Sequence, residues 1–460
     1  MCVDACPVPK EDAEMKTVQQ QYAEKLKTSD EAVKAVKSGD WVDYIVTNAF
    51  PPALDAALAR RKDELEDVKI RGNNILGPIQ VAECDPEREH FTYNSWHMSA
   101  YERKLCDRGL CSYTPMIFRN IIEYYRYFCH VNVAMVQATP MDRHGYFNLS
   151  CSIGVAKGIL DNSDMVIVEV NDKLPKVSGS HDDCIHISEI DYVVEGENQP
   201  LAQVATPQST EIDRQIASHI MPYITDGANL QLGIGGLPGV IGNLIADSDL
   251  KDLGMYTELA GDAYYEIYKA GKLTNRNSYI NRGKGLAGVF IGTDNLYNWI
   301  DENPGILGYP LEIINSPAVQ KNVKKLISIN SGLAADLYGQ VCSESVGTRQ
   351  ISGTGGQLDF LTGAALSEGG RAFICLPSTR TDKEGNVSSN IKPFFTQGDI
   401  ITSPRSQSHL FATEYGAVNL AGKSTWERAE MIISVAHPDF RDELIDAAEK
   451  QKIWRRSNKK

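Results

Sequence analysis

One glutamate and two glycine-rich loops are the residues of this chain best suited to carry out chemistry. Glu258 lies in the segment 254–262, downstream of the loop Gly233-Ile234-Gly235-Gly236-Leu237-Pro238. A carboxylate in water is ionised at neutral pH, so it can attack an acyl carbon without a partner base. The sequence has no G-x-S-x-G elbow to supply a serine nucleophile. We therefore predict acyl chemistry with Glu258 as the nucleophile, against the alternative of a solvated surface glutamate.

The glycine loops favour a ligand site over a surface position for this glutamate. The loop 233–238 follows a predicted strand and precedes a predicted helix, where backbone N–H groups can face an anion or an oxyanion. Its last position is Pro238, so the dinucleotide pattern G-x-G-x-x-G fails, and a tight structural turn remains the alternative. A second glycine loop, 351–360, contains Gly356 and fails the same pattern.

Metal-binding patterns are missing from the sequence, and we predict no metal site. There is no H-E-x-x-H motif, and the Cys2/Cys6 pair has no second pair at zinc-finger spacing. His97 and His144 lie in loop-like, aromatic-rich segments. A structural histidine is the favoured interpretation for each, although either could line a pocket, and the segment around His97 could shape an acyl site.

Length, composition and charge narrow the functional class. The chain has 460 residues, 42% hydrophobic and 23% charged, as expected of a globular protein with two or more domains. Its 46 basic and 60 acidic residues give a net charge of −14, which argues against nucleic acid or an anionic membrane as the main partner. No apolar run approaches the roughly 18 residues of a membrane span, and no secretory signal is visible. With its ten scattered cysteines, we predict a cytoplasmic protein.

The elements expected around the loops occur in the same order in two halves of the chain. In the first half, a helix that starts at Thr28 with Glu31 as capping partner precedes a strand at 41–46 and a helix at 53–61 opened by two prolines. In the second half, a helix at 212–223 precedes a strand at 228–232, the glycine loop and a helix from Pro238 to Ile245. This repetition predicts two related open α/β domains, 1–205 and 206–460. Near-continuous apolar runs predict further, mostly parallel strands at 131–136, 165–170, 326–329, 372–376 and 431–435, before a last helix at 441–452.

Ordered motifs along nearly the whole chain resemble those of the acetyl-CoA hydrolase/transferase family, a branch of the class I CoA-transferases. Within that family they are most similar to the enzymes that move CoA between butyryl-CoA and acetate, followed by 4-hydroxybutyrate CoA-transferases. Tyr256 departs from a histidine common beside the glutamate, and Leu259-Ala260-Gly261 replaces bulkier residues. The matching motifs are Asn94-Ser95-Trp96-His97-Met98-Ser99, Pro140 to Phe147, Gly233 to Pro238, Thr257-Glu258-Leu259, Ser352 to Phe360, Thr413-Glu414-Tyr415-Gly416 and Ala436 to Arg441.

The resemblance implies a fold, a reaction and a set of site residues. The fold would be that of CoA-transferases, with two NagB-like open α/β domains and mostly parallel sheets. The reaction would be ping-pong transfer through a thioester between Glu258 and CoA, so that CoA is a substrate and covalent intermediate and no cofactor is bound permanently. The partners would be acyl-CoA and short carboxylates such as acetate, and we expect a homo-oligomer. The implied CoA contacts are Gly233, Ile234, Gly235, Gly236, Leu237, Leu333 and Gly356.

Two other functions remain open from the sequence. A thioester hydrolase would use the same site but would admit water to the glutamyl-CoA intermediate. A non-catalytic sensor of a small acid or sugar phosphate would not need Glu258. The aromatic ring of Trp96 could form one wall of a short apolar acyl pocket, which favours butyryl and propionyl groups over long chains.

Overall fold

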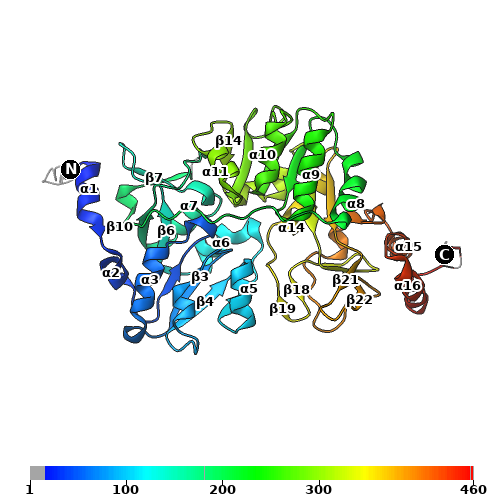
Figure 1. Cartoon of the computed structure of the whole chain (residues 1–460), viewed down its shortest axis with the longest axis horizontal. Helices are drawn as coiled ribbons and strands as arrows, with labels where there is room; N and C mark the ends of the chain where they lie inside the picture. Colours follow the sequence, from blue (N-terminus) through cyan, green and yellow to red (C-terminus); the bar gives the residue numbers. More distant parts are fainter. Residues whose placement is uncertain (1–15, 181, 456, 459–460) are drawn as a thin grey trace, which may run out of the picture.

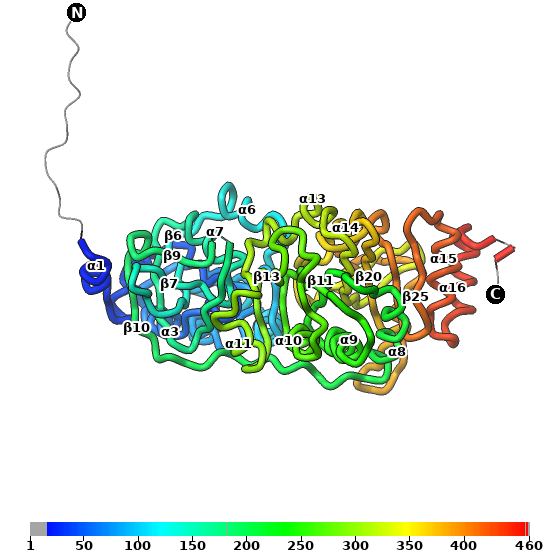
Figure 2. Tube along the Cα trace, turned by 90° about the horizontal axis from the view of Figure 1, so that it is seen from above, coloured from blue at the N-terminus to red at the C-terminus, as the bar shows by residue number. Residues whose placement is uncertain are grey.

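The computed structural model describes residues 16–180, 182–455 and 457–458. Two eight-stranded sheets follow one another along the long axis of the molecule (Figure 1), the first from residues 26–195 and the second from residues 229–419. Helices α1 (Val18–Lys25) and α16 (Pro438–Lys450) lie at opposite ends of that axis (Figure 2). The Cys2/Cys6 pair and the N-terminal segment inspected for a secretory signal lie outside the described residues.

The two sheets have the same strand order relative to the chain. In each half one strand, at 41–43 or at 229–232, is central, the next three strands along the chain extend to one side, and later strands extend to the other. The exception is the outermost strand on that second side of the first sheet, which comes from residues 26–27. The first sheet runs β5 (Cys111–Tyr113), β4 (Phe91–Ser95), β3 (Val68–Gly72), β2 (Trp41–Asp43), β6 (Val131–Ala138), β8 (Ser163–Val170), β10 (Tyr192–Glu195), β1 (Leu26–Lys27). The second runs β14 (Ile306–Gly308), β13 (Gly285–Phe290), β12 (Gly254–Ala260), β11 (Asn229–Leu232), β15 (Leu326–Ser331), β20 (Arg371–Cys375), β24 (Leu410–Thr413), β25 (Gly416–Asn419).

Strand direction confirms the predicted fold class of related open α/β halves. Every neighbouring pair in the first sheet is parallel. In the second sheet the described pairs are parallel except for the edge pair β24–β25, which is antiparallel. The predicted domain boundary at 205–206 falls in the segment between β10 and α8 (Glu211–Ile220).

Helices cover both faces of each sheet, as parallel sheets require. Smaller sheets join β16 (Ala334–Asp336) with β17 (Val341–Cys342) and β23 (Ile391–Lys392), and pair β18 (Ser345–Val346) with β19 (Arg349–Gln350), β21 (Thr379–Thr381) with β22 (Val387–Ser389), and β7 (Tyr146–Asn148) with β9 (Cys184–His186). The first-half helices are α2 (Ser29–Ala32), α3 (Pro52–Arg60), α4 (Gln80–Glu83), α5 (Ala100–Asp107), α6 (Ile121–Tyr127) and α7 (Ala156–Leu160). Those of the second half are α9 (Gly236–Asp247), α10 (Asp262–Lys269), α11 (Asp294–Ile300), α12 (Leu311–Ile314), α13 (Pro317–Gln320), α14 (Gln357–Leu366) and α15 (Thr425–Ser434).

The ends of helices and strands were predicted correctly at some positions and incorrectly at others. The capping box of Thr28 and Glu31 forms at the start of α2, as predicted. The strand predicted at 41–46 is shorter and ends at Asp43, because Ile45 and Thr47 adopt left-handed backbone with φ of 61° and 47°. Helix α9 begins at Gly236 rather than at Pro238, since Gly235, with φ of 127°, turns the chain into the helix.

The strand predicted at 431–435 is wrong, because these residues form the end of α15. Ser424 caps this helix in a capping box with Glu427. The buried residues Ala429, Ile432 and Ile433 follow helical spacing. A short apolar run fits a buried helix face as well as a strand, and the capping box upstream was the signal that distinguished them.

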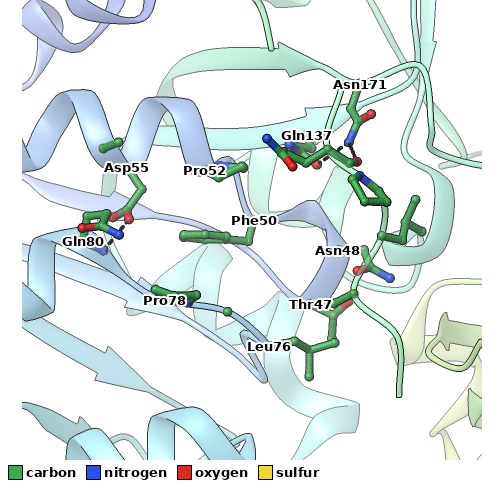
Figure 3. A pocket seen from close by; sticks show the side chains of 16 residues that line it. Thr47, Asn48, Phe50, Pro52, Asp55, Leu76, Pro78, Gln80, Gln137 and Asn171 are labelled. Carbon is green, nitrogen blue, oxygen red and sulfur yellow. Dashed lines mark hydrogen bonds between the residues drawn. The ribbon is translucent and has the colours of Figure 1, made fainter. Parts of the chain in front are cut away.

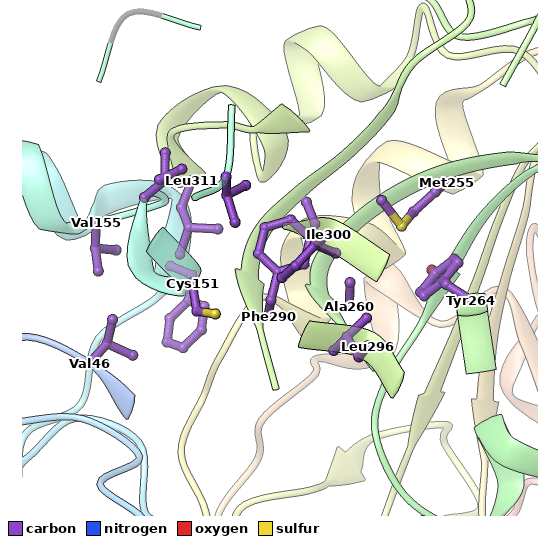
Figure 4. Close-up of a cluster of buried hydrophobic side chains, with 14 of the residues drawn as sticks. Val46, Cys151, Val155, Met255, Ala260, Tyr264, Phe290, Leu296, Ile300 and Leu311 are labelled. Carbon is purple, nitrogen blue, oxygen red and sulfur yellow. The ribbon is translucent and has the colours of Figure 1, made fainter. Parts of the chain in front are cut away.

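The two halves share one hydrophobic core. Figure 4 shows Val46, Cys151 and Val155 of the first half beside Phe290 and Leu311 of the second, all in the largest buried cluster. The backbones also meet, because the Gly154 N–H donates to the Gly288 carbonyl at 2.8 Å. A Cβ atom at Gly154 would lie 2.7 Å from that carbonyl oxygen, so only glycine permits this approach. The two halves are therefore held together by direct packing of side chains and backbone.

Two absences concern the described part of the chain. Among residues 16–180, 182–455 and 457–458, no helix is long and apolar enough to cross a membrane. Within the same ranges no group of three or more histidine, cysteine, aspartate or glutamate side chains could hold a metal ion.

Candidate active site

The predicted site residues meet at the carboxyl edge of the second sheet. Strand β11 is central, and the chain leaves it towards β12 on one side and β15 on the other. Ligands of open α/β sheets bind at such a switch point, outside the carboxyl ends of the strands. The loop from Gly233 follows β11 directly, Glu258 lies near the end of β12, and Leu333 follows β15. Three segments that are far apart in sequence are thereby brought to one edge.

Glu258 is held from two directions by polar groups. The Asn315 side chain, just after α12, donates from Nδ2 to Glu258 Oε2 at 2.6 Å. Gly356, at the N terminus of α14, also lies against the carboxylate, and its backbone N–H lowers the pKa of Glu258. A Cβ atom at Gly356 would overlap with the Glu258 carboxylate and with the Asn315 amide. The glutamate and the second glycine loop are therefore in direct contact.

A second carboxylate and an arginine extend this network. Asn315 Nδ2 also donates to Asp359 Oδ2 at 3.0 Å, so one amide bridges two carboxylates. Arg119, from the first half, pairs with Asp359 Oδ1 at 2.7 Å, and its backbone N–H donates to Oδ2 at 3.1 Å. Sequence reasoning did not find Asn315, Asp359 or Arg119. Of the three, only Asp359 lies inside a matched motif, Ser352 to Phe360.

The first half also holds the second glycine loop in place. Backbone N–H groups of Met98 and Phe118 donate to the carbonyls of Ser352 and Gly355, at 3.4 and 3.3 Å. The ring of His97 packs on that of Phe118 and would contact a Cβ atom at Gly355. The segment around His97 therefore shapes the loop that ends against Glu258, and the site is built by both halves.

The surroundings of Glu258 change the ionisation state expected for its carboxylate at neutral pH. Burial, with a smaller contribution from the nearby Asp359 charge, raises the pKa of Glu258 to about 8, even though hydrogen bonding by Asn315 and Gly356 lowers it. At neutral pH the unliganded site therefore holds Glu258 largely protonated, so the prediction of a carboxylate ionised without assistance is wrong for this state. Burial likewise raises the pKa of Asp359 to about 6, although Asn315 and Arg119 lower it.

This pKa predicts the pH dependence of any reaction in which Glu258 is a nucleophile. Only the ionised form attacks, so kcat/KM for a thioester should rise about tenfold per pH unit below pH 8 and level off above it. Asn315→Leu should move the midpoint to higher pH, because Asn315 favours the ionised form. The measurement is kcat/KM between pH 6 and pH 10, and a flat profile in the wild-type protein would contradict a titrating nucleophile.

The first glycine loop opens towards a cavity rather than towards the Glu258 carboxylate. A cavity of about 380 Å³ is lined by Gly233, Ile234 and Gly235, among others. The side chain of Ile234 is 47% exposed, and a Cβ atom at Gly233 or Gly235 would meet no atom within 4 Å. Gly236 and Leu237 form the first turn of α9, which has no side-chain cap, so its N–H groups stay available to a ligand.

The other residues singled out in the sequence have different positions. Leu333 is partly buried, and its N–H donates to the Cys342 carbonyl at 2.8 Å. Trp96 is fully buried and packs edge-on against Phe118, so it supports the site from behind. His144 is exposed in a turn, where its backbone N–H donates to Asp142.

The first half has a crevice at the matching place, but with a different charge arrangement (Figure 3). A cavity of about 390 Å³ beyond β2 and β6 is lined by Phe50, Gln137 and Asn171, among others. Helix α3, the counterpart of α9, has its N terminus occupied, because the Leu54 N–H donates to Glu169 Oε2 at 3.0 Å. The Glu169 carboxylate occupies the place of an anion there. The N terminus of α3 is therefore occupied by a protein carboxylate, which disfavours an anionic ligand there.

Family models and curated relatives match most of this chain. Residues 10–205 match the N-terminal domain, and residues 292–448 the C-terminal domain, of the acetyl-CoA hydrolase/transferase family. The butyryl-CoA:acetate CoA-transferase of Anaerostipes caccae is 47% identical over 96% of this chain and 99% of its own length. The 4-hydroxybutyrate coenzyme A transferase of Clostridium kluyveri is 34% identical over 94% of this chain and 98% of its own.

A solved structure shows the same fold over nearly the full length. RipA from Yersinia pestis superimposes with a TM-score of 0.87 at 33% identity, covering 95% of this chain and 100% of that one. The 4-hydroxybutyrate CoA-transferase from Porphyromonas gingivalis superimposes with a TM-score of 0.76 at 28% identity. The overall fold is therefore shared with these proteins.

Proposed function

This chain belongs to the acetyl-CoA hydrolase/transferase family, and from that premise we propose that it is a CoA-transferase that moves CoA from a short-chain acyl-CoA, with butyryl-CoA favoured, to acetate. The observation that carries the proposal is the contact of Glu258 with Asn315 and Gly356 at the sheet edge. A carboxylate buried between two hydrogen-bond donors is positioned for covalent catalysis, and a sensor of small acids would gain nothing from it.

The proposed reaction proceeds in two half-reactions through Glu258. Its carboxylate attacks the thioester carbon of acyl-CoA, the C–S bond breaks, and CoA leaves as a thiolate, so that a mixed anhydride of Glu258 and the acyl group is formed. The thiolate then attacks the glutamyl carbonyl carbon and displaces the acid as a carboxylate, which leaves a glutamyl-CoA thioester. Acetate reverses this sequence, so acetyl-CoA departs and the Glu258 carboxylate is restored. The bonds formed resemble those broken, so no further energy source is required.

The groups around Glu258 match the charge that would develop in these steps. When the glutamyl carbonyl is attacked, its oxygen becomes an oxyanion. The Asn315 amide and the Gly356 N–H already donate to this carboxylate, and we assign them to that oxyanion. Arg119 and Asp359 position Asn315, because Asp359 accepts from the same Nδ2. Donors held in place before the reaction stabilise the transition state without reorganisation.

The rates of reaction with a panel of thioesters distinguish this proposal from the alternative functions. With acetate present, butyryl-CoA and propionyl-CoA should give acetyl-CoA faster than palmitoyl-CoA, because each methylene in a short pocket contributes about 1–3 kcal/mol. Without acetate, release of free CoA should be slow. Rapid release in the absence of acetate would identify a hydrolase. An advantage of about tenfold for 4-hydroxybutyryl-CoA over butyryl-CoA would identify a 4-hydroxybutyrate CoA-transferase.

A further inference from the structure

One face of α5 in the first half docks on the second half. Ala100, Arg103 and Asp107 share this face by helical spacing, whereas Glu102 and Leu105 are buried within the first half. Asp107 forms a double hydrogen bond with Arg349, both at 2.7 Å. Arg103 donates from Nε to the Ile351 carbonyl at 2.8 Å. The helix is thereby fixed to the segment that leads to Gly356, and the Arg103 guanidinium has a defined place.

That guanidinium lines the cavity of the first glycine loop. The cavity, of about 380 Å³, lies between α5 and the start of α9. The first half contributes Ala100 and Arg103, and the connecting segment contributes 204–207. The opposite wall of the cavity is mostly bare backbone, because its lining includes Gly233, Gly235, Gly239 and Gly261. The cavity therefore joins an arginine of one half with exposed backbone of the other.

Arg103 is a cation with unused donors. Its Nε–H is donated to Ile351, and among the described residues neither a hydrogen-bond acceptor nor an ion-pair partner is found for the four N–H groups of its two terminal nitrogens. The one carboxylate in the cavity lining, Asp262, is engaged elsewhere, because it accepts from the N–H and the hydroxyl of Thr293 at 3.2 and 3.0 Å. A planar guanidinium with free paired donors matches a phosphate group.

We propose that Arg103 binds a phosphate group of CoA in this cavity, and that the first half thereby selects CoA thioesters over pantetheine thioesters. This inference rests on the proposed CoA-transferase function. Glu258, Asn315 and Gly356 do not line the cavity, so it receives a part of the substrate remote from the reacting carbon. The phosphates are the remote anionic part of CoA, and binding energy from remote groups can support the reaction at the thioester.

The test compares butyryl-CoA with butyryl-pantetheine as donors for Arg103→Ala, Arg103→Lys and the control Lys104→Ala, the exposed neighbour on the same helix. Arg103→Ala should raise KM for butyryl-CoA by roughly ten- to a hundredfold, the effect of one charged hydrogen-bond pair. The KM for acetate and kcat/KM for butyryl-pantetheine should change less than about twofold on the same scale. Arg103→Lys should recover part of the loss, and Lys104→Ala should match the wild type.

Direct binding gives a readout that is independent of turnover. Calorimetric titration should be done on the wild type and on Arg103→Ala with CoA, dephospho-CoA and pantetheine. The variant should bind CoA more weakly than the wild type does, and should bind pantetheine equally well. A loss that disappears with dephospho-CoA assigns the 3′-phosphate, and one that persists assigns the diphosphate. Equal losses for both thioesters would overturn the inference, since Arg103 would then only order the loop through Ile351. A rise in KM for acetate alone would also overturn it. Failure of the wild type to transfer CoA would refute the proposed function instead.

Discussion

Glu258→Gln is expected to reduce CoA transfer to below about a hundredth of the wild-type rate, because the covalent step would lose its nucleophile. The amide keeps the size of the side chain, so Asn315 and Gly356 retain a neighbour of the same shape. Melting temperature should change little, since the substitution removes a carboxyl group whose burial already raises its pKa to about 8. The measurement is acetyl-CoA formation from butyryl-CoA and acetate.

The control for this variant is Glu312→Gln. Glu312 is a partly buried carboxylate on α12, one turn before Asn315, and Glu258 is not among its described partners. It should keep the wild-type rate. A Glu258→Gln protein that retained more than about a hundredth of that rate would show that the carboxylate is not the nucleophile.

Gly356→Ala is expected to lower kcat by at least about a hundredfold while the protein stays folded. The added Cβ atom would overlap with the Glu258 carboxylate and the Asn315 amide, so the glutamate must leave its hydrogen bonds. The backbone of Gly356, with φ of −98°, is accessible to alanine, so the defect arises from the contact and not from backbone strain. The measurement is kcat together with the melting temperature.

Gly305→Ala is the matched control for the added methyl group. A Cβ atom there would meet one neighbouring atom within 4 Å, Oδ1 of Asn303, at 3.1 Å. This variant should keep its activity. If Gly356→Ala lost activity only in proportion to lost folded protein, the glycine would serve the turn before α14 and not the reacting carboxylate.

The sequence predicted the glutamate and the glycine loop of the site, but not the polar side chains that hold them in place. Glu258 and Gly356 were named from motifs and touch in the structure, because β12 and the N terminus of α14 meet at one sheet edge. Asn315 was missed because it follows a short helix in a segment without a motif, and its role depends on a fold that places it between two carboxylates. Arg119 was missed because its partner, Asp359, lies 240 residues away along the chain.

The order of helices and strands was also predicted better than the type of each short segment. Repeated order of helix, strand, loop and helix predicted two related halves, and the matching strand orders of the two sheets confirm it. Short apolar runs were less informative, as the helix at 431–434 shows, because a run of this length is too short to distinguish the buried face of a helix from a strand. The pKa of Glu258 was also beyond the sequence, since it depends on burial and on the charge of Asp359.

The most direct test of the account is the mass of the protein after incubation with butyryl-CoA alone, followed by peptide mapping. With no acceptor acid present, the first half-reaction should stop at the glutamyl-CoA thioester. The peptide that contains Glu258 should then gain the mass of CoA less one water, and Glu258→Gln should gain nothing. An unchanged wild-type mass, or an adduct on a different residue, would contradict Glu258 as the residue that carries CoA.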